Sequence, residues 1–337
     1  MKQSPQVSVI VPTYQRRESV QRALTALCRQ TLPPEAFEVI VVIDGSEDGT
    51  REQLAAFHAP YHLQTHWQPN QGRATACNTG IRLAQGELLI LLDDDMEPVS
   101  EFIEGHVGAH QNRTRLGVMG AVPINLDASS PPVVQYIGAK FNQHLEKLNQ
   151  PGYQLQLRDF YTGNFSISRA VMNEVGGFDE GFKIYGNEDL ELAWRLRQAG
   201  VSLVYDPAAC AYQHYTKDFR ALAQDNLAKG KTAVLLASKH QSTFYELKLS
   251  RYREGSRKWR LLRRLLLLAS YRSDLVSRLV LQAVALAERW RVPPLHLFYS
   301  WALDYFYWLG VARSLNTGTE PDRQLGALFA ARGAPRV

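Results

Sequence analysis

The sequence predicts an α/β fold built on a mainly parallel sheet, and two observations support this prediction. Between residues 7 and 92, apolar segments typical of strands alternate with segments whose apolar residues recur at helical spacing. The plainest strand covers residues 88–92, five apolar residues in a row that suit burial on both faces. Strands that alternate with helices form βαβ units, which place their strands in parallel.

The same patterns set the order of the elements. The first strand ends at Pro12, and the second leads into the glycine-containing turn of residues 44–50. A later helix starts after Asn187 and stops at Gly200, as the capping residues indicate. We expect strands at residues 7–12, 37–43, 61–67, 87–92, 116–122, 161–168 and 201–205. We expect helices at residues 18–29, 51–57, 72–84, 102–110, 188–196 and 222–238, and a turn-rich loop over residues 125–160.

Cysteine usage and the N-terminus indicate the compartment. The three cysteines, Cys28, Cys77 and Cys210, form no CxxC pair, which argues for a reducing compartment and against a disulfide framework or a zinc site. Residues 1–6 lack the apolar core of a signal peptide, so we expect the protein to start in the cytosol. The net charge of +5 is mild, and no nucleic acid is expected among the partners.

Three consecutive carboxylates, Asp93, Asp94 and Asp95, stand directly after the central strand. Ligands of open α/β sheets bind beyond the carboxyl ends of the strands, so chemistry is expected here. Like charges this close raise one another's pKa unless a cation compensates them, and a divalent metal that also binds substrate phosphates would do so. A solvated acidic turn without a function would give the same pattern, so these residues alone leave both interpretations open.

Six segments of the chain occur in the order typical of one family. They read VSVIVPTY, VIVVIDGSEDGT, NQGRATACNTGIRLAQGELLILLDDD, TGNFSISR, VGGFDE and NEDLELAWRLRQAG. Each segment alone is a weak signal, whereas six in the right order are a strong one. Over roughly residues 5–217 the chain therefore resembles the family 2 glycosyltransferases, with their GT-A fold for nucleotide-diphospho-sugars.

The resemblance implies an inverting transferase that moves a sugar from a nucleotide diphosphate to an acceptor hydroxyl. UDP-sugars are the family's commonest donors, and dTDP- and GDP-sugars stay open. Asp189, in the Glu188-Asp189 pair, matches the family's general base, and these two residues are the predicted catalytic pair. Acids in the first turn of a helix also favour the helix dipole, which is the structural alternative for both. Gly163 and Asn164 match the loop beneath the donor sugar and the acceptor.

The resemblance also implies the donor and metal sites. Asp95, together with His214, would bind a Mg²⁺ or Mn²⁺ that bridges the two phosphates, although a histidine between tyrosines is as often packed or exposed. Such a metal stabilises the charge that builds on the leaving diphosphate. The predicted donor-binding residues are Pro12, Thr13, Tyr14, Asp44, Arg73, Asp93 and Asp94, with Asp44 on the base and Asp93 towards the ribose.

The chain departs from the family pattern at two positions. Ile43 precedes Asp44 where the family often has a second aspartate, so base recognition is expected to be looser. Cys77 stands before Asn78 where an arginine is common. Arg73, four positions earlier, would supply the positive charge in its place.

Other functions compete with this interpretation. A haloacid-dehalogenase-type phosphatase also has an apolar strand that ends in aspartates, but its motif normally follows the first strand, and here three strands are expected before it. A nucleotidyltransferase would need a glycine-rich phosphate loop after the first strand, and residues 13–17 contain no glycine. A non-catalytic sugar-nucleotide-binding or scaffold protein is the third alternative, which the retained Asp93, Asp95 and Asp189 disfavour.

The last third of the chain differs in character. We expect a catalytic domain of residues 1–220, with its donor half at about 1–97 and its acceptor half at about 98–220, and a helical region of residues 221–337. The uncharged runs of this region are shorter than the about 20 residues of a spanning helix. A basic amphipathic segment near aromatic residues suits the membrane interface, here through residues 251–311 at the inner face of the cell membrane. A helical subdomain that covers the catalytic domain or forms a homo-oligomer would give the same pattern. A glycan or lipid-linked acceptor, in cell-surface polysaccharide or glycolipid synthesis, would fit a cytoplasmic enzyme with such a C-terminus.

Overall fold

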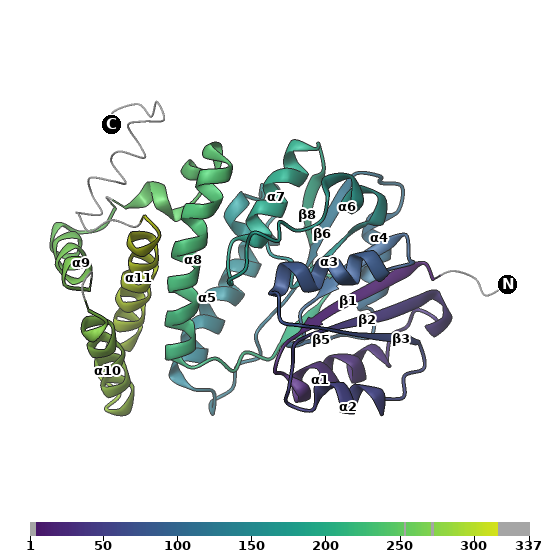
Figure 1. Cartoon of the computed structure of the whole chain (residues 1–337), viewed down its shortest axis with the longest axis horizontal. Helices are drawn as coiled ribbons and strands as arrows, with labels where there is room; N and C mark the ends of the chain where they lie inside the picture. The colour runs from purple at the N-terminus through teal and green to yellow at the C-terminus, as the bar shows by residue number, and fades with distance from the viewer. Residues whose placement is uncertain (1–4, 253, 271–272, 316–337) are drawn as a thin grey trace. The chain divides into compact units, whose positions relative to one another are not determined.

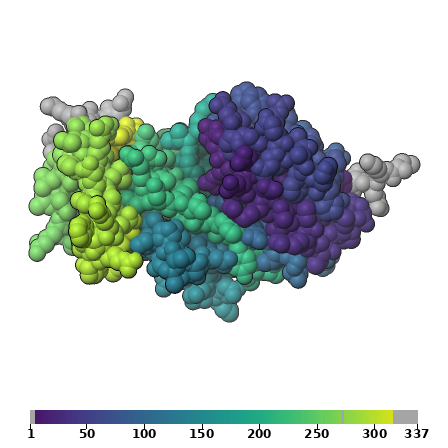
Figure 2. Space-filling view, turned by 90° about the horizontal axis from the view of Figure 1, so that it is seen from below, coloured from purple at the N-terminus to yellow at the C-terminus, as the bar shows by residue number. Residues whose placement is uncertain are grey.

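The computed structural model describes residues 5–252, 254–270 and 273–315, and these residues form two compact units. The first unit contains the described residues up to 130, with 137–183 and 188–215. The second contains 131–136, 184–187 and the described residues from 216 onward. Figure 1 shows the elements of both, and in Figure 2 the N-terminal segments, purple and blue, lie together at the surface of the first unit.

The first unit is built on a mainly parallel sheet, as predicted. In sheet order its strands are β3 (His62–Gln68), β2 (Phe37–Asp44), β1 (Val7–Thr13), β4 (Leu88–Leu92), β7 (Asn164–Ser168), β6 (Leu116–Gly120) and β8 (Ser202–Asp206). Strand β7 is antiparallel to its neighbours β4 and β6, and the other pairs are parallel. All five residues of β4 are buried, which explains why this strand has no polar position.

Helices cover the sheet. They are α1 (Arg17–Leu27), α2 (Thr50–Ala55), α3 (Arg73–Leu83), α4 (Phe102–His110), α6 (Arg169–Val175) and α7 (Glu188–Gln198). Helix α3 packs so closely on β1 that a Cβ atom at Gly80 would collide with the side chain of Ile10. The glycine inside this helix therefore allows the close approach, which fixes α3 and its first residue against the sheet. A small antiparallel pair, β5 (Met96–Pro98) and β9 (Ala211–Gln213), lies beyond the end of β4.

The prediction of a loop over residues 125–160 is wrong, because helix α5 (Pro132–Leu148) and the short helix η2 (Leu157–Asp159) lie within it. The consecutive prolines suggest a break in structure, but Pro132 takes the first helical position, where the missing N–H is not needed. The helix buries Val133, Val134, Leu145 and Leu148. Apolar spacing was therefore the stronger signal, and proline marked the start of the helix.

The second unit is helical. Its elements are α8 (Phe219–Lys239), η3 (Gln241–Tyr245), η4 (Lys248–Arg251), α9 (Arg257–Ser270), α10 (Leu275–Arg289) and α11 (Leu295–Ser314). The short helix η1 (Pro34–Ala36) belongs to the first unit. Figure 1 shows α11 between α8 on one side and the pair α9 and α10 on the other. In the part of the chain that the structure describes, no helix has both the length and the apolar composition that crossing a bilayer requires.

Candidate active site

Arg73 joins two of the predicted site residues at the carboxyl end of β4. Its Nη2 lies 2.7 Å from Oδ1 of Asp93, directly after β4, and its Nη1 lies 3.1 Å from Oδ1 of Asp189 in the first turn of α7. The hydroxyl of Thr162 accepts a hydrogen bond from Arg73 Nη2 at 3.0 Å and donates one to Asp189. Residues far apart in the sequence thus meet around one guanidinium group.

The charges around Arg73 are balanced by carboxylates. Burial lowers its pKa, but Asp93, Asp189 and Glu188 together raise it well above the usual arginine value. Glu188 is buried, with Oε1 3.8 Å from Arg73 Nη1. The guanidinium also lies over the ring of Phe178, 5.8 Å from its centre, which brings the VGGFDE segment to the site. Arg73 therefore places one positive charge between Asp93 and Asp189.

Asp94, the middle carboxylate, points into the protein. It is 6% exposed and accepts hydrogen bonds from Thr13 Oγ1 at 2.7 Å and from Arg16 Nη1 at 3.0 Å. Burial raises the pKa of Asp94 to about 7, against the opposing effect of the Arg16 charge. Thr13 and Asp94 were both predicted to bind the donor, but in this structure their side chains bind each other.

Asp95 and His214 come together through the backbone and not through the side chain of His214. The His214 N–H donates to the Asp95 carbonyl oxygen at 2.8 Å, whereas ring Nε2 lies 2.6 Å from Oε2 of Glu97. Oδ2 of Asp95 lies 3.2 Å from Arg16 Nη1 and 3.4 Å from Gln213 Nε2, whereas Oδ1 is buried without a hydrogen-bond partner. Burial and then the charge of Asp93 raise the pKa of Asp95. Within the described ranges, no three His, Cys, Asp or Glu side chains are grouped as ligands of a metal ion.

The residues predicted to hold the nucleoside lie at the ends of β1 and β2. Asp44 accepts hydrogen bonds from Gln68 Nε2 at 2.8 Å and from the backbone N–H groups of Gln71 and Gly72 at 3.0 and 2.9 Å. It is 4% exposed, so it fixes the segment that leads into α3. Tyr14, in the loop after β1, has half of its surface exposed. Pro12 is partly buried within β1.

Gly163 and Asn164, predicted to contact the acceptor, have different surroundings. The Gly163 carbonyl accepts from the Asp93 N–H at 2.9 Å, and a Cβ atom at Gly163 would lie 2.6 Å from Asp93 Oδ2. Only glycine therefore leaves Asp93 in place. The Asn164 side chain is fully buried, with Nδ2 bonded to the carbonyls of Ala121 and Ala209 and Oδ1 2.8 Å from Nε2 of His106. A contact between this loop and an acceptor would have to come from its backbone.

The buried His106 makes the fold sensitive to acid. Burial lowers the pKa of His106 to about 3, below its ordinary value, so the unfolded chain binds a proton that the folded chain excludes. Stability is therefore expected to be complete above about pH 6.5 and to fall as the pH drops towards 3, by on the order of 1–2 kcal/mol at pH 5. Urea unfolding at pH 7.5 and pH 5 measures this loss, which should shrink in a His106→Gln variant. An equal loss in the variant would assign the effect to other groups.

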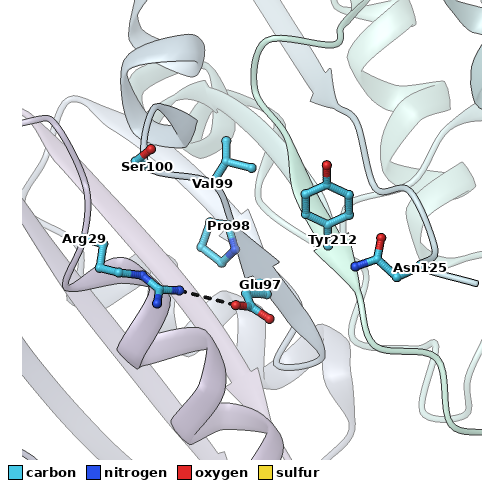
Figure 3. A pocket seen from close by; sticks show the side chains of 7 residues that line it. All are labelled: Arg29, Glu97, Pro98, Val99, Ser100, Asn125 and Tyr212. Atoms are coloured by element: carbon cyan, nitrogen blue, oxygen red, sulfur yellow. Dashed lines mark hydrogen bonds and ion pairs between the residues drawn. The ribbon is translucent and has the colours of Figure 1, made fainter.

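Figure 3 shows a pocket beside the site. It has a volume of about 320 Å³ and lies between α1, β5 and β9, with Arg29, Glu97 and Tyr212 in its lining. Arg29 Nη2 points to Oε1 of Glu97 at 3.3 Å, and the same carboxylate binds His214. A larger pocket of about 540 Å³ is lined by residues of β6, the α5–η2 segment and β8. Asp93, Asp95 and Asp189 line neither pocket, so we place the site on the contacts of Arg73.

Arg16 and Thr162 also lie at the site, and the sequence did not predict either of them. Arg16 lies in the loop after β1, and its charge offsets Asp94 and Asp95. In the sequence Arg16 is marked only as part of a basic pair, Arg16-Arg17, that follows β1. The neighbouring strand β4 is followed by the three carboxylates. Thr162 stands directly before Gly163 in the TGNFSISR segment, and no local pattern marks its contact with Asp189.

Two family models match the sequence. The model of glycosyl transferase family 2 matches residues 8–176, and that of the N-terminal domain of galactosyltransferase matches residues 143–218. Among curated proteins, the glycosyltransferase YfnE of Bacillus subtilis is 30% identical over 245 residues, which cover 58% of this chain and 61% of YfnE. Validoxylamine A glucosyltransferase of Streptomyces hygroscopicus subsp. limoneus is 30% identical over 223 residues, 59% of this chain and 49% of that protein. The matched region thus spans about half to three-fifths of these relatives.

Solved structures show the same fold. The mannosyltransferase PcManGT from Pyrobaculum calidifontis, in complex with GDP-Man and Mn²⁺, covers 98% of this chain and 80% of its own, with a TM-score of 0.53 and 21% identity. Residues 1–349 of S. aureus TarS, in complex with UDP-GlcNAc, cover 93% of this chain and 92% of that one, with a TM-score of 0.53 and 15% identity. GalNAc-T7, solved with UDP, GalNAc and Mn²⁺, covers 71% of this chain and 48% of its own, with a TM-score of 0.50 and 14% identity. At these identities the likeness concerns the fold, which is GT-A. Because the family model matches half of its length, the chain belongs to glycosyl transferase family 2.

Proposed function

We propose that this protein transfers a sugar from a nucleoside-diphosphate donor to an acceptor hydroxyl, with inversion at the anomeric carbon. The observation that supports this most is the position of Arg73, which lies between Asp93 at the end of β4 and Asp189 in the first turn of α7. A donor-binding carboxylate and a candidate base thereby share one cation. Family membership adds support, since the named relatives are glycosyltransferases.

Asp189 is the proposed general base. Arg73 and Thr162 both contact its Oδ1, and we assign Oδ2 to the proton of the acceptor hydroxyl. A carboxylate held in this way can take the proton as the hydroxyl oxygen attacks, provided that the acceptor lies within hydrogen-bond reach. Single displacement requires no protein nucleophile. Glu188 is buried beside Arg73, so we propose that it balances charge there and does not touch the acceptor.

The side-chain oxygens of Asp95 are suitable ligands for a divalent metal. Its buried Oδ1 lacks a hydrogen-bond partner, and a carboxylate oxygen is a ligand that Mg²⁺ and Mn²⁺ accept. These ions commonly use one or two carboxylates and complete their shell with substrate phosphates and water, so a closed cluster of protein ligands is not required. When bound, the metal would stabilise the charge that develops on the diphosphate. The complexes of PcManGT and GalNAc-T7 with Mn²⁺ support this proposal. His214 could join only if its ring left Glu97.

The donor and acceptor are proposed by class. A UDP-sugar is favoured, since TarS binds UDP-GlcNAc and GalNAc-T7 was solved with UDP, although PcManGT binds GDP-Man. The exposed ring of Tyr14 is the side chain best placed to contact the nucleoside, because Asp44 is already engaged within the fold. For the acceptor we retain a glycan or a lipid-linked glycan, in polysaccharide or glycolipid synthesis. The haloacid-dehalogenase alternative conflicts with the family, and its nucleophile would be expected after the first strand.

Nucleotide binding tests this function directly. UDP in excess over its dissociation constant, together with Mn²⁺, should raise the melting temperature by about 5 °C or more, and GDP and dTDP should raise it less. The rise should require the metal and should be lost in an Asp95→Ala variant. Differential scanning fluorimetry of the purified protein measures all these combinations.

Two results would contradict different parts of the proposal. If no nucleotide stabilises the protein with or without Mn²⁺, a scaffold role becomes the better explanation. If nucleotide with Mn²⁺ stabilises the Asp95→Ala variant as much as the wild type, Asp95 is not a metal ligand, although the protein still binds nucleotide. Glu52→Gln, an exposed carboxylate on α2, is the matched control and should respond like the wild type.

A further inference from the structure

Helix α9 buries Arg263 and Ser270 together with Leu267 on its inner side. Arg263 is 3% exposed, and its guanidinium donates to Asp304 Oδ2 at 3.0 Å and lies over the rings of Tyr252 and Trp308. On the opposite side the leucines face outward: Leu261, Leu262, Leu265 and Leu268 are 59, 46, 55 and 42% exposed. A helix on a water-facing surface normally buries its leucines and exposes its arginines. The orientation of α9 therefore indicates that its outer side meets an apolar medium.

Helix α10 continues this apolar surface. Leu275, Leu279, Leu286 and Trp290 recur at spacings of four, seven and four residues, and more than half of each side chain is exposed. Helices α9 and α10 contact each other, and both pack against α11 (Figure 1). We call these eight residues the outer face. Most of the large apolar side chains exposed in the described residues lie on or beside it. Contiguous exposed apolar patches often mark an interaction site.

Basic residues outnumber acidic ones beside the outer face. Arg257 and Lys258 on α9, and Arg278 and Arg289 on α10, are exposed on the same sides of their helices as the leucines. Helix α9 contains no acidic residue. The one acid of α10, Glu288, accepts a hydrogen bond from the Tyr299 hydroxyl at 2.6 Å, and Asp274, just before α10, pairs with Arg313.

We propose that the outer face binds peripherally to an anionic lipid bilayer. Leucines with tryptophan at the level of the headgroups, flanked by arginine and lysine, are the chemistry that such an interface accepts. A second copy of the chain is a poorer partner, because a two-fold interface would carry the same surplus of basic residues on both of its sides. Peripheral binding also agrees with the absence of a spanning helix among the described residues. The inference does not depend on the catalytic proposal.

Vesicle co-sedimentation of the full chain tests the proposal. In 50 mM salt, vesicles of phosphatidylcholine with about one-third phosphatidylglycerol should bind the protein at least tenfold more tightly than vesicles of phosphatidylcholine alone, and 500 mM salt should weaken this binding. A Leu265→Gln, Leu279→Gln, Leu286→Gln variant should lose at least tenfold in affinity. An Arg257→Gln, Lys258→Gln, Arg278→Gln, Arg289→Gln variant should lose the preference for anionic vesicles. Each removed charge should lower the affinity for these vesicles by about fivefold or less.

The substituted positions are exposed, so the variants should melt within a few degrees of the wild type, and Leu126→Gln, an exposed leucine of the first unit, is the matched control. Failure of the wild type to bind anionic vesicles overturns the proposal, as does full binding by the leucine variant. Light scattering gives a third outcome: a wild-type dimer that the leucine variant dissociates would assign the outer face to self-association. Since no nucleotide is present, these results are independent of the proposed transfer reaction.

Discussion

Replacement of Asp189 by asparagine is expected to lower the rate of sugar transfer by about 10²–10⁴-fold, the usual contribution of a general base. Asparagine keeps the shape of the side chain and can still meet Arg73 and Thr162, but it cannot take a proton from the acceptor. Initial rates with a saturating donor measure the effect. Nucleotide-dependent thermal stabilisation should stay close to the wild-type value, because the proposed donor contacts lie at the ends of β1, β2 and β4.

Two comparisons separate chemistry from structure in this variant. Glu52→Gln should retain full activity, since Glu52 is exposed on α2. If Asp189→Asn kept more than about a tenth of the wild-type rate, another group would have to be the base. If it lost nucleotide stabilisation as well, Asp189 would act through Arg73 and the donor site.

Replacement of Arg73 by methionine is expected to destabilise the free protein by about 2–3 kcal/mol, which corresponds to several degrees in melting temperature. Its removal leaves Asp93, Asp189 and the buried Glu188 without their shared cation. The loss is smaller than for a fully buried pair, because the Arg73 side chain keeps 22% of its surface exposed. Urea unfolding measures the change, and nucleotide binding should weaken in parallel.

A double-mutant cycle assigns the cause of this loss. In an Asp93→Asn background, Arg73→Met should cost at least 1 kcal/mol less, because one of the carboxylates is already neutral. Arg82→Met, on the same helix at a position that is 62% exposed, is the control and should change stability little. Equal losses in both backgrounds would show that Arg73 acts through packing and not through its charge.

The sequence predicted the parts of the fold that depend on local pattern. The strand segments of the parallel sheet and the position of Asp93 to Asp95 after β4 follow from apolar runs with clear ends. Arg73 could also be selected from the sequence. Cys77 lacks the positive charge that is common at its position, and Arg73 lies about one helical turn before it on α3. Helix α5 was missed because consecutive prolines, taken locally, resemble a loop signal.

The remaining details depend on contacts between distant residues. Three consecutive carboxylates look alike in the sequence, but Thr13 and Arg16 draw Asp94 inward while Arg73 holds Asp93. The pairing of His214 with Glu97 arises because β9 lies beside β5. Asn164 resembles an exposed loop residue in the sequence, yet its side-chain amide is buried and hydrogen-bonded to two backbone carbonyls and His106. No local rule contains these partners.

The reversed direction of β7 has a consequence for how such a site can diversify. Because β7 is antiparallel to β4, and Leu92 pairs with Asn164, Thr162 and Gly163 reach the carboxyl edge of β4 at the start of β7. The segment that carries α5 and η2 therefore enters the site immediately before a fixed strand. It can be lengthened, shortened or rewritten during evolution while β1, β2 and β4 keep their register. Under the proposed function, selection on the acceptor can thus act on this segment while the proposed nucleotide contacts on β1, β2 and β4 are inherited unchanged.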